Sequence, residues 1–253
     1  MDTMDSKQTG RKRTGLVVAL ALCCLLAVGG VFAWFSTTTS KTNTFTQGGG
    51  ITEPTEKPNP GPTNPDGGGD GGTETIKPEG NIIETEWVDE TGITPESIVA
   101  KNPNIGIGKG SKNAYVFVEV ENALDPANAY FVLGNKWAPV DELAKKYTGD
   151  KDVTIAAPDR TYTGGLFVYV GDNKTGTIAD DMAMLTGKTD VSVYTGEVFN
   201  KVYTNKDFKF GSSNNTITIK AYLAAASNEK ENMNTAEVKG EVLVKAKAWA
   251  AKN

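Results

Sequence analysis

The chain contains no histidine, and its two cysteines, Cys23 and Cys24, are adjacent in one apolar segment near the N-terminus. The absence of imidazole excludes Ser-His-Asp and Cys-His catalytic arrangements and every zinc site built on histidine. A chain cleaved beyond Cys24 would also lack any thiol nucleophile and any disulfide. The length of 253 residues suits one or two domains.

Positive charge is scarce after the N-terminal segment. Residues 1–33 hold four of the 26 basic and two of the 31 acidic side chains, so their removal leaves 22 basic and 29 acidic groups and a net charge of −7. This charge repels phosphate backbones and anionic membranes over about a Debye length. We therefore expect no nucleic-acid partner.

The N-terminal segment has the pattern of an export signal. The basic cluster Arg11-Lys12-Arg13 precedes an uncharged run over residues 15–35, and Val31-Phe32-Ala33 fits the pattern that signal peptidase reads. We predict that residues 1–33 are a signal peptide, cleaved between Ala33 and Trp34, and that the protein is secreted. The alternative is an uncleaved anchor, because residues 16–35 are about long enough to span a bilayer.

The next segments differ sharply in composition. Residues 34–46 are rich in threonine and aromatic residues and contain neither glycine nor proline, which predicts a strand. Sixteen of the thirty-four residues 47–80 are glycine or proline, which predicts a disordered linker. Residues 81–253 are then long enough for a single domain without disulfides.

Short β-branched and aromatic runs separated by glycine, asparagine and aspartate predict the fold of residues 81–253. The runs are 114–121, 130–133, 153–155, 166–170, 191–194 and 216–223. This spacing favours an all-β domain, an antiparallel jelly-roll-like β-sandwich, with Ile217 and Ile219 on the buried face. We expect a C-terminal helix over 235–252 that caps an open end of the sandwich, and a short helical turn over 141–147.

Catalytic chemistry has little support in the sequence. The paired carboxylates are Asp89-Glu90, Asp180-Asp181, and Glu119 with Glu121, and a glycosidase would need two acids facing each other across a groove. Solvated surface acids are the favoured interpretation. We assign no catalytic residue, no metal ligand and no cofactor. A lysine–asparagine amide staple between strands stays open, since the spacing identifies no pair.

Four segments carry a resemblance to a known family. Residues 29–46 read Gly-Gly-Val-Phe-Ala-Trp-Phe-Ser-Thr-Thr-Thr-Ser-Lys-Thr-Asn-Thr-Phe-Thr, and residues 101–120, 193–202 and 217–226 look like family strands. Together they resemble the TasA and camelysin group of Gram-positive biofilm fibre proteins, which are exported with a SipW-type signal peptide. Protease activity attributed to camelysin is not carried over, because the chain has no H-E-x-x-H motif.

The resemblance implies a jelly-roll subunit of extracellular biofilm matrix fibres whose main partner is another copy of itself. Residues 34–46 could add as a strand to the sheet edge of the next subunit, and such a head-to-tail contact propagates into a filament. The candidate assembly residues are Phe35, Thr37, Thr39 and Phe45. Cell-surface or matrix components are further possible partners.

Two other functions stay open. One is a cell-surface adhesin or carbohydrate-binding β-sandwich on a flexible stalk with an uncleaved anchor. Exposed Trp87 or Trp137 would favour it, although burial of each in the core is the expected role. The other is a secreted hydrolase that uses the unassigned carboxylates.

Overall fold

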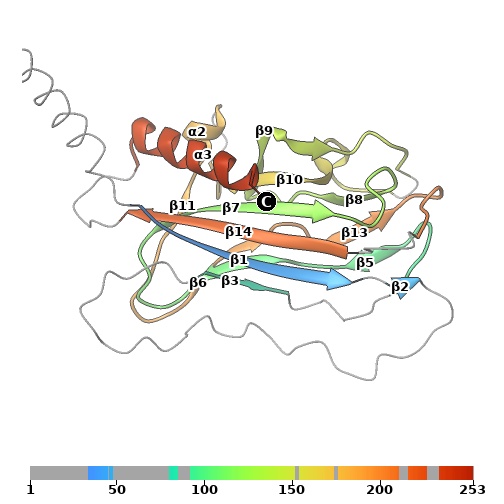
Figure 1. Cartoon of the computed structure of the whole chain (residues 1–253), viewed down its shortest axis with the longest axis horizontal. Helices are drawn as coiled ribbons and strands as arrows, with labels where there is room; N and C mark the ends of the chain where they lie inside the picture. The colour runs from blue at the N-terminus through green and yellow to red at the C-terminus, as the bar shows by residue number, and fades with distance from the viewer. Residues whose placement is uncertain are drawn as a thin grey trace, which may run out of the picture.

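The computed structural model describes residues 34–44, 46–47, 80–84, 92–151, 154–173, 176–210, 216–226 and 234–252. Two antiparallel sheets pack face to face, and helices cover the outer face of the larger sheet (Figure 1). The larger sheet has the strand order β1-β14-β7-β10-β8-β13-β5, with β9 beside β10 and β11 beside β7. The second sheet has the order β12-β6-β3, and β2 pairs with β4 in a short parallel ladder.

The bounds of the elements follow the chain. They are β1 (Trp34–Thr44), β2 (Thr46–Gln47), β3 (Gly80–Ile83), β4 (Gly92–Ile93), β5 (Ile98–Ala100), β6 (Asn104–Ile107), β7 (Ala114–Asn122), β8 (Ala129–Val132), β9 (Trp137–Lys146), the 3₁₀ turn η1 (Pro158–Arg160), β10 (Thr161–Tyr169), α2 (Ile178–Asp181), β11 (Met184–Leu185), β12 (Val193–Glu197), β13 (Lys201–Thr204), β14 (Thr216–Ala226) and α3 (Ala236–Ala250).

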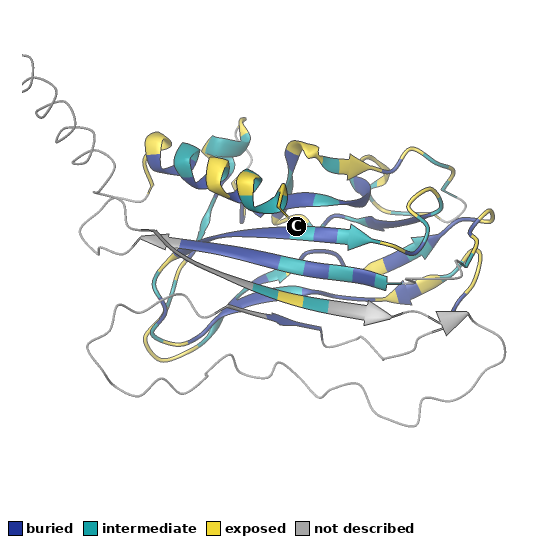
Figure 2. Ribbon diagram, in the orientation of Figure 1, coloured by how far each residue is buried: buried dark blue, intermediate teal, exposed yellow. Residues whose placement is uncertain are grey.

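Strand β7 contributes to two apolar layers because successive side chains of a strand point to opposite faces. Val116, Val118 and Val120 belong to the core between the two sheets, whereas Tyr115 and Phe117 belong to the layer beneath the helices. All five are buried, and Figure 2 shows the continuous buried stretch along β7. Strand β7 is therefore covered on both faces.

Strand β14 shows the same division. Ile217 and Ile219 are fully buried in the core between the sheets, as the alternation of residues 216–220 predicted. Tyr222 lies on the other face, in the layer under the helices. The predicted antiparallel β-sandwich with a C-terminal helix is therefore confirmed.

Helix α3 begins where a capping residue allows it. Thr235 accepts a hydrogen bond from the backbone N–H of Val238 and so satisfies one of the free N–H groups of the first turn. Val238, Val242 and Ala246 are buried, and Trp249 stacks on Tyr222 of β14 with ring centroids 5.5 Å apart. The helix covers the outer face of the large sheet, so the expectation that it caps an open end of the sandwich is wrong.

Two local predictions are also wrong. Residues 141–147, predicted as a helical turn, belong mostly to β9, which pairs with β10 through two register shifts. Pairing with β10 outweighs the helix preference of this segment. The backbone of Asp141 has φ +40, which is incompatible with a right-handed helix. Of the predicted strand 153–155, the described residues 154 and 155 lie outside any strand.

Candidate functional site

The most extended feature is the pairing of the N-terminal strand with β14. Strand β1 runs antiparallel to β14 over eleven residue pairs, from Trp34 opposite Ala226 to Thr44 opposite Thr216. It forms one edge of the large sheet, and the two strands lie side by side in Figure 1. In the single chain, the edge beside β14 is thus filled by the chain's own β1.

The predicted assembly residues fall on this strand as follows. Phe35 lies opposite Ala225, Thr37 opposite Leu223 and Thr39 opposite Ala221. Phe45 and the cleavage residue Ala33 lie outside the described residues, and Trp34 is the first residue of β1. The structure pairs β1 with β14 of the same chain. The sequence alone did not specify whether this strand pairs within one chain or with a neighbour.

A buried charge cluster connects β1 with the second sheet. Glu84 follows β3, and its carboxylate lies 2.5 Å from the Nζ of Lys101 and 3.5 Å from the Nζ of Lys41 on β1. The side chains of Glu84 and Lys101 are 0% exposed, whereas that of Lys41 is 37% exposed. Sequence reasoning missed this cluster, because Lys101 lies beside an Asn-Pro pair that is typical of a turn.

Burial lowers the pKa of Lys101 from its ordinary value of 10.5 to about 8, because desolvation of the ammonium outweighs the attraction of Glu84. Lys41 lowers this pKa further through like-charge repulsion. Lys101 has the most strongly lowered pKa among the described lysines. Lys101 is therefore more easily deprotonated in the folded protein than in the unfolded chain, while its Nζ still donates a hydrogen bond to Glu84.

We expect the stability of the fold to rise between pH 7.5 and 9.5 by about 2 kcal/mol through Lys101. Between its folded and unfolded pKa values the unfolded state binds more protons, so raising the pH favours the folded state. Below pH 8 the burial penalty is present in full, and above pH 10.5 it is gone. Urea unfolding at both pH values measures this rise in the free energy of unfolding. The double variant Glu84→Gln/Lys101→Met, which lacks the titrating lysine, is the control. The same change with pH in both proteins would contradict the prediction.

Among the acids considered for catalysis, Glu121, Asp180 and Asp181 have partners within the fold. Glu121 forms an ion pair with Lys220 of β14 at 2.6 Å, and burial raises the pKa of the Glu119 carboxyl, which is on the same strand face. Asp180 accepts a hydrogen bond from Thr177 Oγ1 at the start of α2, while Asp181 accepts one from Gly176 N. Asp89 and Glu90 lie outside the described residues.

A groove of about 580 Å³ lies on the outer face of β8 and β13 and between their loops. Its lining includes the aromatic rings of Phe199 and Tyr203 and the polar side chains of Asn135, Asn200 and Lys201. Trp137 is fully buried, as expected, and packs edge-on against Tyr169, while Trp87 lies outside the described residues. Sequence reasoning missed the groove, because its residues come from three separate segments, 132–136, 156–157 and 196–203.

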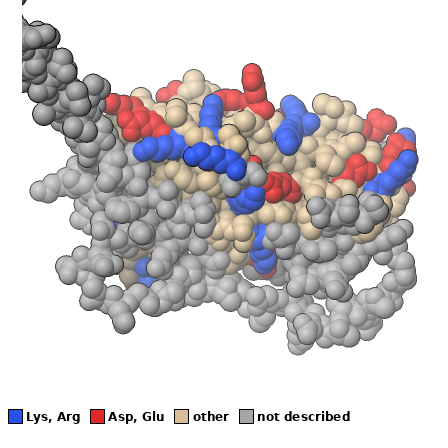
Figure 3. Space-filling view, in the orientation of Figure 1, with Lys and Arg blue, Asp and Glu red and all other residues tan. Residues whose placement is uncertain are grey.

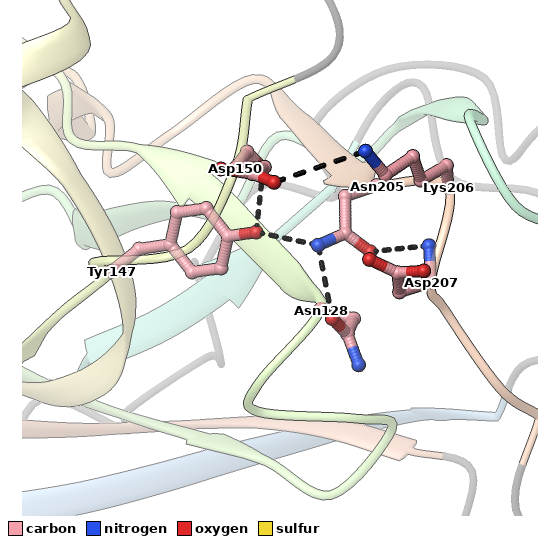
Figure 4. A network of polar contacts seen from close by, with 6 residues as sticks. All are labelled: Asn128, Tyr147, Asp150, Asn205, Lys206 and Asp207. Carbon is pink, nitrogen blue, oxygen red and sulfur yellow. Dashed lines mark hydrogen bonds and ion pairs between the residues drawn. The ribbon is translucent and has the colours of Figure 1, made fainter.

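A polar network near this groove holds loops together (Figure 4). Asn205 donates from Nδ2 to Asn128 Oδ1 and to the Tyr147 hydroxyl, which donates to the backbone oxygen of Asp150. Asn205 Oδ1 accepts from the backbone N–H of Asp207. The Tyr147 ring stacks on Tyr130, so both ends of the side chain are fixed. These bonds indicate a structural role.

The surface charge is mixed. Figure 3 shows basic and acidic side chains interspersed over the described part of this face. Among the described residues, no group of three or more metal-ligating acidic, cysteine or histidine side chains occurs. None of the helices in the described segments is long and apolar enough to cross a membrane.

Comparison with protein-family models, curated proteins and solved structures finds no match. The family resemblance therefore rests on the sequence segments alone. The structure adds the pairing of β1 with β14 at the edge of the large sheet and the charge cluster that connects β1 with the second sheet.

Proposed function

We propose that the protein is a secreted structural subunit of extracellular matrix fibres, which assemble when β1 of one subunit fills the β14 edge of the next. The observation that carries the proposal is the pairing of β1 with β14 along its full length at the edge of the sheet. The sequence resemblance to biofilm fibre proteins and the predicted export signal support it.

Exchange of β1 between subunits would preserve the contacts seen within one chain. The same eleven backbone pairings can form in either arrangement, because only the origin of the strand changes. Residues 48–79, which are rich in glycine and proline, join β1 and β2 to β3. Their composition predicts a flexible linker, and a linker of that length would span about 30 Å, which would let β1 reach a neighbour's edge.

A disulfide between β1 and β14 should block assembly. Ser40 lies opposite Lys220, and the mature chain would contain no other cysteine, so Ser40→Cys/Lys220→Cys can form one bond. Directly opposed residues in a sheet have Cβ atoms close enough for a disulfide. We expect the oxidised monomer of the mature form to stay monomeric and the reduced protein to form filaments, as seen by light scattering and electron microscopy.

The matched control locks two strands of the body instead. Glu119 of β7 lies opposite the same Lys220, so Glu119→Cys/Lys220→Cys leaves β1 free. This control should assemble in both redox states. Filaments from the oxidised β1 lock would show that assembly does not use strand exchange, and absence of filaments from every form would oppose the fibre function itself.

The groove favours a second candidate function, a carbohydrate-binding surface domain. Tyr203 offers a partly exposed ring, and the amides of Asn135 and Asn200 offer donors and acceptors, which is the combination that sugar sites use. Calorimetric titration with matrix and cell-wall oligosaccharides tests it. Binding that is lost in Asn200→Ala would support this function, and no binding to any sugar would oppose it.

A further inference from the structure

The sequence of β1 leaves its own register weakly specified. The strand reads Trp-Phe-Ser-Thr-Thr-Thr-Ser-Lys-Thr-Asn-Thr, so its central part repeats small hydroxyl side chains on both faces. A slip by two residues keeps every side chain on its face and mostly exchanges one threonine or serine for another. Lys41 is the single charged residue of the strand.

The partner of Lys41 occupies a fixed position. Lys41 lies opposite the buried Ile219, and its Nζ is 3.5 Å from Glu84 Oε2. Glu84 follows β3 in the other sheet, and its second oxygen contacts the fully buried Lys101. The backbone N–H of Lys101 bonds to Asn200 O, so the carboxylate is held by the body of the domain.

A shift of β1 would break this contact. Two residues of a strand span about 6.7 Å, which exceeds the reach of an ion pair. The shift would bring Thr39 or Asn43 opposite Ile219 in place of Lys41, and neither carries a charge. Glu84 would then keep Lys101 but lose the cation that β1 supplies.

We propose that the Lys41–Glu84 ion pair sets the register of the strand beside β14 and restricts this edge to strands that carry a cation at that position. The pair therefore acts as a specificity determinant of the acceptor edge. Its extension to a strand from a second copy of the chain rests on the proposed function, whereas the register within one chain does not.

Cysteine pairs can read the register directly. In the mature form, Ser40→Cys/Lys220→Cys reports the register of the structure, and Thr38→Cys/Lys220→Cys and Thr42→Cys/Lys220→Cys report shifts by two residues in either direction. With Lys41 present, we expect a disulfide only in the first pair. With Lys41→Gln added, we expect the shifted disulfides to increase by roughly tenfold, because the ion pair with a buried carboxylate is lost.

Moving the lysine provides a gain-of-function test. The change Lys41→Thr/Asn43→Lys places the cation two residues later on the same face, so the strand should shift until the relocated ammonium meets Glu84 and the Thr42→Cys/Lys220→Cys pair becomes the main disulfide. Lys41→Arg keeps the charge and should keep the original pair. In Glu84→Gln/Lys101→Met, which removes the buried charges together, moving the lysine should have no effect on register.

The results separate this inference from the proposed function. An unchanged disulfide pattern in Lys41→Gln and in the moved-lysine variant would overturn the inference, since another feature would then set the register. Non-reducing gels show whether each disulfide lies within one chain or joins two. If all disulfides formed under assembly conditions lie within one chain, strand exchange between subunits is opposed. The conclusion about which residue sets the register of β1 against β14 would still hold.

Discussion

Replacing Lys101 by methionine is expected to lower the free energy of unfolding by about 3–5 kcal/mol. The change removes the hydrogen bond that Lys101 Nζ donates to the fully buried Glu84 carboxylate, a bond that the deprotonated amine would keep, and leaves the partly exposed Lys41 as the remaining counter-ion among the described ion pairs. Burial of a charge without its closest partner is among the most costly single changes in a protein. Urea unfolding at pH 7, followed by tyrosine and tryptophan fluorescence, measures the loss.

The double variant Glu84→Gln/Lys101→Met is the matched control for this prediction. It removes both buried charges, and replacement of a buried ion pair as a whole is often neutral or stabilising. We therefore expect the double variant to be within about 1 kcal/mol of the unchanged protein. A double variant as unstable as Lys101→Met would contradict the argument, because packing of the lysine stem rather than charge balance would then explain the loss.

Alanine at Gly165 is expected to destabilise the fold by about 3 kcal/mol or more. Gly165 has φ +108, and it lies in β10 where this strand pairs with β7 on one side and β9 on the other. A Cβ there would collide with the carbonyl oxygen of Leu143 and lie 2.7 Å from the Cα of Ala144. The backbone atoms of β9 cannot move aside without breaking the hydrogen bonds between β9 and β10. The cost of the positive φ for alanine and the cost of the steric overlap therefore add.

Gly240→Ala is the control for this second change. Gly240 lies in α3, and a Cβ built there would meet no atom within 4 Å. Alanine in a helix interior is more favourable than glycine, so we expect a gain of about 0.5–1 kcal/mol. Thermal unfolding of both variants tests the pair. If Gly165→Ala proved as stable as Gly240→Ala, the close approach of β9 and β10 at Gly165 would be wrong.

The sequence was sufficient to predict those strands and helices in which the spacing of apolar residues matches the face that the fold buries. Residues 216–220 alternate polar and apolar side chains, and the structure buries Ile217 and Ile219 as this alternation requires. Helix α3 has an apolar repeat, Val238, Val242, Ala246 and Trp249, and this repeat predicted the helix that the structure contains. In each case the local preference and the tertiary contacts favour the same conformation.

Where tertiary contacts oppose local preference, the prediction was wrong or absent. The segment Asp141-Glu-Leu-Ala-Lys-Lys146 has helix-favouring residues, yet it pairs with β10 as part of β9. Short strands such as β5 and β6 have too few residues to show a period. The contact between Glu84 and Lys101 joins two strand ends across the sandwich, and one sequence has no signal for such a contact.

The two ends of the main strand order of the large sheet differ greatly in length, since β1 has eleven residues and β5 has three. Each subunit would offer one strand to give and one long edge to receive it, and β5 is too short to accept β1 along its length. A fibre built in this way would be polar, with a vacant β14 edge at one end and an undonated strand at the other. A free peptide with the sequence of residues 34–44 would then cap growth at one end only.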